Sequence, residues 1–542
     1  MIDGKCQICQ NAGCQISPSY GRAPDLVIST RQHGLYKLSK HKTRLTDEMA
    51  AILSESVELN CGLVLPNRLC KAAMAEMLGR AGGSNPTYKL LKLYEEWQKG
   101  DWGLILTGNV MVDPRFLGTP CDIIVPEDAL EDAKTLKLWK NYAIACKGKD
   151  GRTPAIVQLN HTGRQSGRGM GRPRSEPSLG PSDQPLKLKG SEGWIASTMS
   201  SLAFNTPRAM TFDDIKLVIE QFKRAALLAH RSGFDGVQVH CSHGYLLSQF
   251  HSPDVNTRTD AYGGDNRGRS KLLHEIIDAI RSVTPSSFCV SVKLNSSDYV
   301  AGGMTEEDAL EMTGWLAERG DVDLLEVSGG TYQNAEMLRD DNEQSERDAR
   351  KQSVKKVEQD QGDGSIAKAG SKREAFFTEF AKRAKPTVEK LKPAHARLPM
   401  RIMVTGGFRT RPAIAGAIED GACDIVGLGR PACVVPDLPR YMLDASLSDE
   451  NARAPRYSVR GTFLIKLVPL NVIGPGINTL WHDLQLFRIA GGKKTVPQRN
   501  LPILLLTTMV SPQMGFAALA TLLVALLALS PTLRSVLLGL KH

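Results

Sequence analysis

The feature that most constrains this chain is a repeated alternation of short apolar segments with longer amphipathic ones between about residue 60 and residue 445. Each short segment is largely apolar or β-branched and is followed by turn or polar residues, as expected of strands that are buried on both faces. The eight strand candidates are NRLCKAAM (67–74), WGLILTGNV (102–110), TPAIVQLN (153–160), GFDGVQVHC (233–241), FCVSVKLN (288–295), DLLEVSGG (323–330), MRIMVTGG (400–407) and DIVGLGR (424–430). Eight such cycles predict an α/β fold, the (β/α)8 TIM barrel.

The segments between the strand candidates have the periodicity of amphipathic helices. Such helices are predicted, for instance, at residues 87–99, 211–232 and 304–320. In the second segment Ile215, Val218 and Phe222 recur at helical spacing, and Thr211 is a suitable N-cap. An open doubly wound sheet is the alternative fold, but it would require a glycine-rich turn after its first strand, and KAAMAEMLG is not such a turn.

With 542 residues the chain is longer than one barrel needs, and a composition of 42 % apolar and 23 % charged residues is that of a globular protein. We therefore expect segments outside the barrel. The predicted organisation is a disordered leader at 1–50, a barrel at 51–445 with a mobile charged insert at 338–374, a basic extension at 446–500 and an apolar tail at 501–542.

The tail predicts a membrane anchor. Residues 501–533 contain no charged side chain, and the preceding residues 446–500 carry eight Lys or Arg against three acidic residues. A basic segment beside an uncharged one is typical of a membrane protein and not of a nucleic-acid-binding protein. Residues 514–533 are about 20 in number, which at roughly 1.5 Å each is enough for a transmembrane helix across a core of about 30 Å.

The orientation follows from the flanking charges and from cysteine usage. The basic extension precedes the predicted span, and positive residues favour the cytosolic side. The 11 cysteines are scattered singly and no cleavable signal opens the chain, which indicates a reduced compartment. We therefore expect a single-pass C-terminal anchor with the barrel facing the cytosol.

Binding and catalytic residues of a TIM barrel lie at the ends of its strands, where the eight βα loops meet. The last two strand candidates end in TGGF and GLGRP, which place Gly406, Gly407, Gly429 and Arg430 together. Backbone amides and a guanidinium at strands seven and eight predict a phosphate site. The alternative is that these glycines only permit tight turns.

Two further strand ends carry polar side chains. Gln158 offers an amide donor and acceptor, and Lys293 offers a cation. Together they are suited to the pyrimidine edge of a flavin, where a cation stabilises negative charge near N1 of the reduced ring. Taken singly, each would be read as an ordinary polar loop residue.

The fourth strand ends in His240, His243 and Tyr245. Two N–H donors are suited to hold a carbonyl oxygen, and a phenol is suited to deliver a proton. Zinc is the alternative for His-x-x-His, but no third ligand is well placed, so we predict no metal. Three N-terminal thiols likewise lack an obvious fourth ligand: Cys6, Cys9 and Cys14.

From about Leu59 to Pro439 the chain resembles the Old Yellow Enzyme family of FMN-dependent ene-reductases, also called NADH:flavin oxidoreductases. The motifs that carry the resemblance are LPNRLCKAAM, WGLILTGN, VQLNHTGRQS, HCSHGYLLSQFHSPDVNTRTDAYGG, VKLNSSDY, MVTGGFRTR and GLGRP. The resemblance implies that FMN is contacted by Met74, Gly108, Gln158, Lys293, Gly407 and Arg430. It also implies that His240 and His243 bind a substrate carbonyl and that Tyr245 protonates the substrate.

The activity implied by this resemblance is a ping-pong reaction in which NAD(P)H reduces FMN and an α,β-unsaturated carbonyl compound is then reduced at its C=C bond. The resemblance also places Ala75 beside the flavin, and here the chain departs from the family, whose members usually carry Thr or Cys at this position. A second departure is DNRGRSKLL, where the family has a Glu-Asn-Arg motif. Two alternatives therefore remain: oxidation or isomerisation of a specialised metabolite, and a catalytically weak membrane flavoprotein. Larger relatives add an iron-sulfur cluster, but no cysteine follows Cys433 to bind one.

Overall fold

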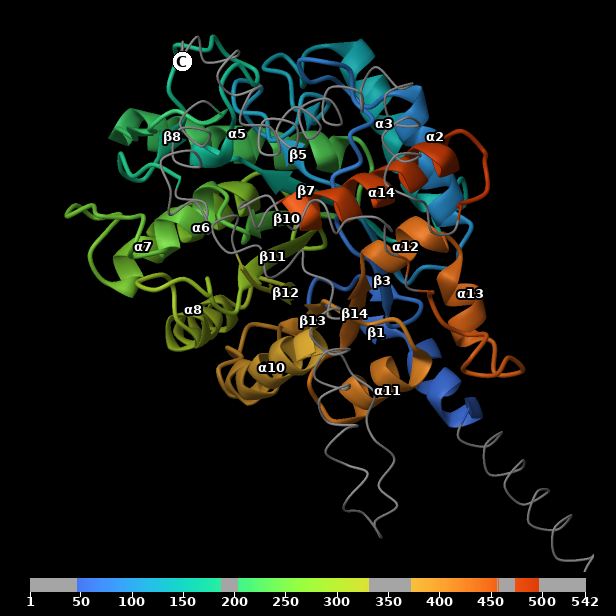
Figure 1. Ribbon diagram of the computed structural model, residues 1–542. Coiled ribbons are helices and arrows are strands. Elements are labelled where there is room, and N and C mark those ends of the chain that lie inside the picture. Colours follow the sequence, from blue (N-terminus) through green and yellow to red (C-terminus); the bar gives the residue numbers. More distant parts are fainter. Residues whose placement is uncertain (1–45, 187–202, 331–371, 456, 458–472, 497–542) are drawn as a thin grey trace, which may run out of the picture.

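The computed structural model describes residues 46–186, 203–330, 372–455, 457 and 473–496. Within these residues parallel strands close into a barrel, because β14 pairs with β3 and β10 pairs with β7 (Figure 1). All eight predicted strands are confirmed: β3 (Leu69–Lys71), β4 (Leu104–Leu106), β7 (Ala155–Asn160), β10 (Gly236–Cys241), β11 (Cys289–Asn295), β12 (Leu324–Ser328), β13 (Arg401–Thr405) and β14 (Ile425–Leu428).

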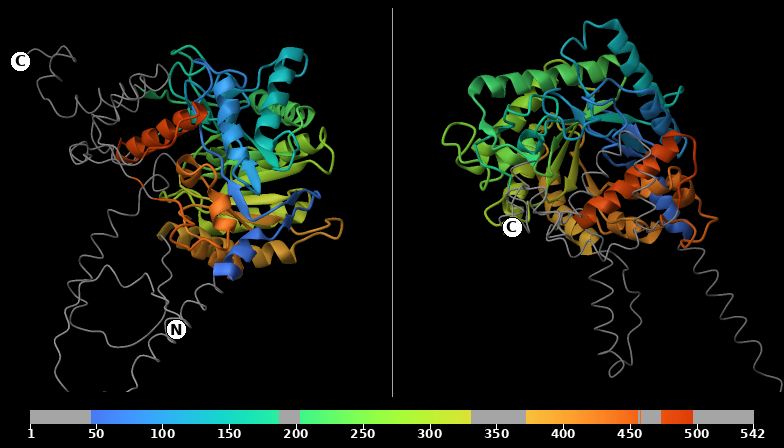
Figure 2. Two further views of the ribbon diagram at one scale, coloured as in Figure 1. Left: turned by 90° about the vertical axis from the view of Figure 1, so that its right-hand side faces the viewer. Right: turned by 45° about the horizontal axis from the view of Figure 1, so that its top comes forward.

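Helices surround the strands in the ring that is typical of a TIM barrel (Figure 2). They are α2 (Tyr88–Gln98), α3 (Ala133–Lys147), α5 (Phe212–Arg231), α6 (Leu246–His251), α7 (Asn266–Arg281), α8 (Glu306–Arg319), α10 (Lys372–Lys390), α11 (Arg411–Glu419), α12 (Arg430–Val434) and α13 (Leu438–Leu443). Thr211 caps α5 as predicted, because its side chain accepts a hydrogen bond from the N–H of Asp214. The predicted barrel is therefore confirmed together with three of its helices, α2, α5 and α8.

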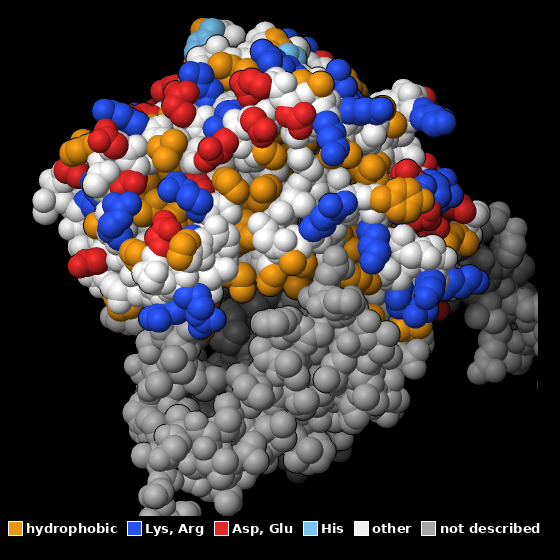
Figure 3. Space-filling view, turned by 90° about the horizontal axis from the view of Figure 1, so that it is seen from above, with side chains coloured by type: hydrophobic (Ala, Val, Ile, Leu, Met, Phe, Trp, Pro, Cys, Tyr) orange, Lys and Arg blue, Asp and Glu red, His pale blue; other side chains and the backbone are white. Residues whose placement is uncertain are grey.

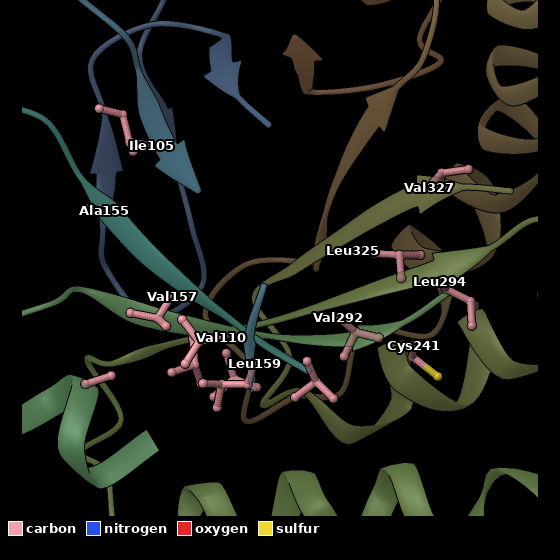
Figure 4. Close-up of a cluster of buried hydrophobic side chains, with 14 of the residues drawn as sticks. Ile105, Val110, Ala155, Val157, Leu159, Cys241, Val292, Leu294, Leu325 and Val327 are labelled. Atoms are coloured by element: carbon pink, nitrogen blue, oxygen red, sulfur yellow. The ribbon is translucent and has the colours of Figure 1, made fainter. Parts of the chain in front are cut away.

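The core has two parts, one on each side of the strands. Outward-facing side chains such as Val157, Val292 and Leu325 pack between strands and helices (Figure 4). Inward-facing side chains at the N-terminal ends of the strands form a second apolar cluster, which includes Ile156 and Leu324. The hairpin of β1 (Val57–Glu58) and β2 (Val64–Leu65) contributes to this second cluster and closes that end of the barrel.

Short strands in the loops extend the sheet beyond the barrel. β5 (Val110–Met111) pairs with β7 and with β6 (Ile123–Ile124), while β8 (Leu179–Gly180) and β9 (Arg208–Ala209) form a separate two-stranded sheet. On the outer surface, the face shown in Figure 3 carries Lys and Arg interspersed with Asp and Glu, and no single sign of charge dominates that view.

Part of the predicted basic extension is a helix that packs on the barrel. Helix α14 (Ile473–Ala490) lies against α2 and α12 (Figures 1 and 2). Trp481, Leu486 and Ile489 on this helix are buried. This contact differs from the prediction for residues 446–500, which was a basic extension leading to a membrane.

Several predictions fall mostly outside the described residues. The leader at 1–50 is described only from residue 46, where a helix runs to residue 54, and the insert at 338–374 is described only from Lys372, the first residue of α10. The predicted span at 514–533 lies wholly outside. Among the helices that the structure describes, none combines the length and the apolar character needed to cross a membrane.

Gly236 tests how tightly the barrel closes. A Cβ at Gly236 would lie 2.3 Å from the backbone oxygen of Cys289 on the neighbouring strand, which has no room to move away. Gly236→Ala should therefore lower the free energy of unfolding by about 1–3 kcal/mol, measured by denaturant unfolding. The control is Gly416→Ala in α11, where nothing lies within 4 Å of the added Cβ. It should be neutral or stabilising by up to about 1 kcal/mol, and equal losses in both variants would contradict this account.

Candidate active site

A cavity of about 420 Å³ opens at the C-terminal ends of the barrel strands. Its volume lies in the range that small-molecule and cofactor sites commonly have. Eleven of the twelve residues predicted from the sequence line it: Met74, Ala75, Gln158, His240, His243, Tyr245, Lys293, Gly406, Gly407, Gly429 and Arg430. Residues predicted from the strand ends therefore lie around one cavity, although they are hundreds of positions apart in the chain.

His240, His243 and Tyr245 form an aromatic cluster on one side of this cavity. The ring centroid of His240 lies 5.2 Å from that of His243 and 4.9 Å from that of Tyr245. The chain makes this turn with positive φ angles at His243 (61°) and Gly244 (74°). Left-handed backbone is uncommon for a residue other than glycine and is often found at functional sites.

Ser242 provides the polar contacts of His240 at Nδ1. The N–H of Ser242 donates to Nδ1 at 3.4 Å, and the hydroxyl oxygen of Ser242 lies 3.2 Å from the same nitrogen, which leaves Nε2 facing the cavity side of the ring. Burial, with smaller effects of His243 and of the Lys293 charge, holds the pKa of His240 well below its usual value. The neutral ring therefore offers one N–H donor at physiological pH.

His243 and Tyr245 are held by polar contacts of their own. Nε2 of His243 lies 2.8 Å from the hydroxyl oxygen of Ser328, and its backbone N–H donates to Oδ1 of Asn295 at 3.1 Å. The side-chain amide of Asn109 donates to the phenol oxygen of Tyr245 at 3.4 Å. The phenol oxygen of Tyr245 therefore accepts a hydrogen bond from Asn109 at the edge of the cavity.

Gln158 and Lys293 lie at the base of the cavity. Nε2 of Gln158 donates to Oε1 of Gln238 at 2.7 Å. Nζ of Lys293 pairs with a carboxylate oxygen of Glu326 at 2.8 Å, in an ion pair that the sequence analysis did not anticipate. Both partners are almost completely buried, so the charge of Lys293 has a compensating charge directly beneath the cavity.

The predicted phosphate end has the backbone that such a site requires. Gly406 and Gly407 have φ angles of 153° and 82°, which L side chains rarely adopt. Arg430 and a second arginine, Arg409, line the same cavity. Glycine backbone with two guanidinium groups at one end, and an amide and an ammonium at the other, fits the phosphate and the pyrimidine of FMN.

Gly108 is the predicted residue that does not line the cavity. Its N–H donates to Oε1 of Glu76 at 2.8 Å and to the phenol oxygen of Tyr94 at 2.8 Å. A Cβ at Gly108 would lie 2.1 Å from Oε2 of Glu76. The N–H of Gly108 is therefore already bonded inside the protein.

Two distant helices contribute residues to the cavity that were not predicted from the sequence. Phe377 comes from α10, and α14 supplies Thr479, His482, Asp483 and Leu486. The only signal in the sequence was the His-Asp pair inside the otherwise apolar stretch LWHDLQLF. Which cavity such a pair lines depends on the packing of α14 against α2 and α12, and a linear pattern does not reveal this packing.

One cluster of possible metal ligands lies away from the cavity. In the described part of the chain, Cys61, Cys289 and Asp323 are the one group of three such side chains whose ligand atoms lie within 4.8 Å of one another. Cys289 begins β11 and Asp323 precedes β12, so the group lies at the opposite end of the barrel. The three N-terminal thiols considered above fall outside the described residues.

The model of the NADH:flavin oxidoreductase / NADH oxidase family matches residues 60–381. The NADH-dependent flavin oxidoreductase iliE of Hypocrea jecorina (strain QM6a) is 36 % identical over 419 residues, which cover 77 % of this chain and 95 % of that protein. The NADH-dependent flavin oxidoreductase iccE of Talaromyces variabilis is 35 % identical over 453 residues, which cover 81 % of this chain and 98 % of the relative.

Solved structures agree with the fold. Morphinone reductase in complex with tetrahydroNAD superposes with a TM-score of 0.52 at 22 % identity, covering 73 % of this chain and 92 % of that one. The Old Yellow Enzyme homologue from Zymomonas mobilis gives a TM-score of 0.53 at 19 % identity, covering 73 % of this chain and 93 % of that one. At these identities the likeness supports the barrel fold alone.

The buried carboxyl of Asp483 makes the stability of the folded protein depend on pH. Burial is the cause that raises the pKa of its carboxyl to about 8. The carboxyl is protonated in both folded and unfolded states below about pH 4, but from there to about pH 8 only the folded state keeps the proton. Native stability attributable to this group is therefore lost as the pH rises.

Asp483→Asn should thus have little effect on stability at pH 4 and should stabilise the FMN-saturated protein increasingly up to pH 8. The gain is at most about 1.4 kcal/mol per pH unit. Thermal and denaturant unfolding across this pH range measure it. Asp213→Asn on the exposed face of α5 is the control and should show no such trend, whereas a pH-independent effect of Asp483→Asn would contradict the assignment.

Proposed function

Because this chain belongs to the NADH:flavin oxidoreductase / NADH oxidase family and is an NAD(P)H-dependent FMN oxidoreductase, we propose that it reduces the activated C=C bond of α,β-unsaturated carbonyl compounds by a ping-pong mechanism. The observation that carries this proposal is the cluster of His240, His243 and Tyr245 on one wall of the cavity. It combines donors for an oxygen with a separate source of a proton.

The cofactor is assigned to this cavity by the chemistry of its two ends. Gly406, Gly407, Gly429, Arg409 and Arg430 would hold the phosphate of FMN. Gln158 and Lys293 would hold the pyrimidine edge, and the end of β3 would supply the contacts to the ring from Met74 and Ala75. When bound there, FMN would supply the hydride chemistry that connects NAD(P)H with the C=C bond of the substrate.

The histidines polarise the substrate. The Nε2–H of neutral His240 donates to the carbonyl oxygen, and His243 binds the same oxygen from the adjoining turn. Donors aimed at an oxygen that gains negative charge stabilise the transition state more than the ground state. A low pKa of His240 suits this role, because a neutral ring donates without adding a buried charge.

Tyr245 supplies the proton. Its O–H transfers a proton to the α-carbon while the β-carbon receives the hydride, so both carbons of the former double bond become saturated. Asn109 donates to the phenol oxygen and orients the O–H of Tyr245. The same hydrogen bond stabilises the phenolate that remains after the proton transfer, because a hydrogen bond to a charged oxygen is stronger than one to a neutral oxygen.

Attachment to a membrane is a second part of the proposal and rests on sequence alone. The uncharged residues 501–533 and the basic residues before them support a single-pass anchor at 514–533 with the barrel facing the cytosol. The substrate would then be a small molecule that reaches the barrel from the cytosol or from the membrane surface.

Tyr245→Phe should separate the two half-reactions. Stopped-flow absorbance should show flavin reduction by NAD(P)H nearly unchanged and flavin reoxidation by 2-cyclohexenone slowed by about 10² to 10⁴-fold, because only the second half-reaction needs the proton. Tyr262→Phe is the matched control, since this hydroxyl bonds to Glu275 away from the cavity and should affect neither half-reaction. Equal slowing of both half-reactions by Tyr245→Phe would show that Tyr245 acts structurally.

The anchor is tested by cell fractionation. The full chain should sediment with membranes and resist carbonate extraction, while a chain that ends at Arg499 should be soluble and still bind FMN, because it keeps α14. Full-length protein found entirely in the soluble fraction would refute the anchor without affecting the proposed chemistry.

A further inference from the structure

A buried network below the cavity connects the two residues assigned to the pyrimidine of FMN. Gln158 lies level with Gln238 in the pairing of β7 with β10, and Lys293 lies level with Glu326 in the pairing of β11 with β12. Oε2 of Glu326 accepts a hydrogen bond from Nε2 of Gln238 at 2.9 Å, and Oε1 of Gln238 accepts from Nε2 of Gln158 at 2.7 Å. Glu326 therefore contacts the support of Gln158 and, through its other oxygen, Lys293 itself at 2.8 Å.

Glu326 determines which atom donates and which accepts in each hydrogen bond of this network. An ionised carboxylate only accepts hydrogen bonds, so the side chain of Gln238 must turn its NH2 group toward Glu326. Its carbonyl oxygen then faces Gln158, and Gln158 must in turn present its own NH2 group to Gln238. The carbonyl oxygen of Gln158 is left as the acceptor available to the cavity. A glutamine side chain without such a partner can adopt either of two orientations that differ by a flip of the amide.

Glu326 also balances the charge of Lys293. The two charged atoms lie 2.8 Å apart, and the side chains retain 5 % and 0 % of their exposure. Opposite charges at such a distance and burial interact strongly, and either one left alone would be costly. The cation that faces the cavity is therefore part of a neutral pair and not an isolated positive charge.

We propose that Glu326 is a positioning residue that holds Gln158 in a single orientation and lowers the reduction potential of bound FMN by neutralising Lys293. The proposal rests on the placement of FMN in the proposed function. An unpaired cation beside N1 would stabilise the reduced flavin, which carries negative charge there. The carboxylate offsets that stabilisation, so the bound flavin remains a stronger hydride donor than Lys293 alone would permit.

The test is the midpoint potential of the FMN-loaded protein, measured by spectroscopic redox titration against reference dyes. Glu326→Gln should increase the preference for reduced over oxidised FMN by about tenfold or more, which corresponds to a rise of about 30 mV for two electrons. Lys293→Met should change the potential in the opposite direction. Glu275→Gln, which removes a carboxylate on the outer surface, is the control and should leave the potential unchanged.

Two further variants keep the test decisive if Glu326→Gln does not fold. The double variant Lys293→Met with Glu326→Gln contains no unpaired buried charge, and its potential should lie above that of Lys293→Met alone. Gln238→Leu keeps the ion pair but removes the support of Gln158, so it should weaken FMN binding about tenfold with little change in potential.

An unchanged or lower potential in Glu326→Gln, or a double variant no different from Lys293→Met, would overturn the proposal. Failure of the proposed function would give a different result. The variants would show the predicted order of midpoint potentials, but the reduced flavin of the wild-type protein would not be reoxidised by any enone.

Discussion

Closure of the parallel barrel is the constraint on which the site depends. Because β14 pairs with β3 and β10 with β7, adjacent strands hold fixed registers, and alternate side chains of each strand point into the interior. These registers set Gln158 level with Gln238 and Lys293 level with Glu326. A slip of one residue in either pair would turn those polar side chains toward the surrounding helices.

The two ends of the barrel interior differ in character: one end is an apolar core and the other contains the polar residues of the site. The N-terminal end is apolar and is closed by the β1–β2 hairpin, so it contributes stability by burial. The C-terminal half is polar, and its buried charges have partners within the protein. Inside the barrel, Lys293 pairs with Glu326. Outside the barrel, on the helix-facing side of β3, Lys71 donates to the backbone oxygen of Leu106 at 2.8 Å and lies 4.1 Å from the ring centroid of Trp97.

The part of the site predictable from sequence is the part encoded by neighbours in the chain. His240, His243 and Tyr245 follow directly on one strand, and the glycines lie at two strand ends, so a correct strand assignment placed them correctly. A role for Glu326 was not predicted, because it is a single charged residue within an otherwise apolar strand segment and its partner Lys293 lies on the preceding strand. Gly108 was placed in the cavity because nothing in its local sequence reveals that Glu76 takes its N–H.

The cavity is built from two kinds of element: the residues assigned to the chemistry lie on strand ends, and part of the surrounding wall comes from helix α14. The residues assigned to the reaction come from strand ends, whose positions the strand registers fix. Asp483 and Leu486 instead reach the cavity from a helix that packs against α2 and α12. Substitutions on α14 alter the cavity wall without disturbing any strand pairing. A neutral Asp483 carboxyl, with its pKa raised to about 8 by burial, presents a hydrogen-bond donor on that wall at neutral pH.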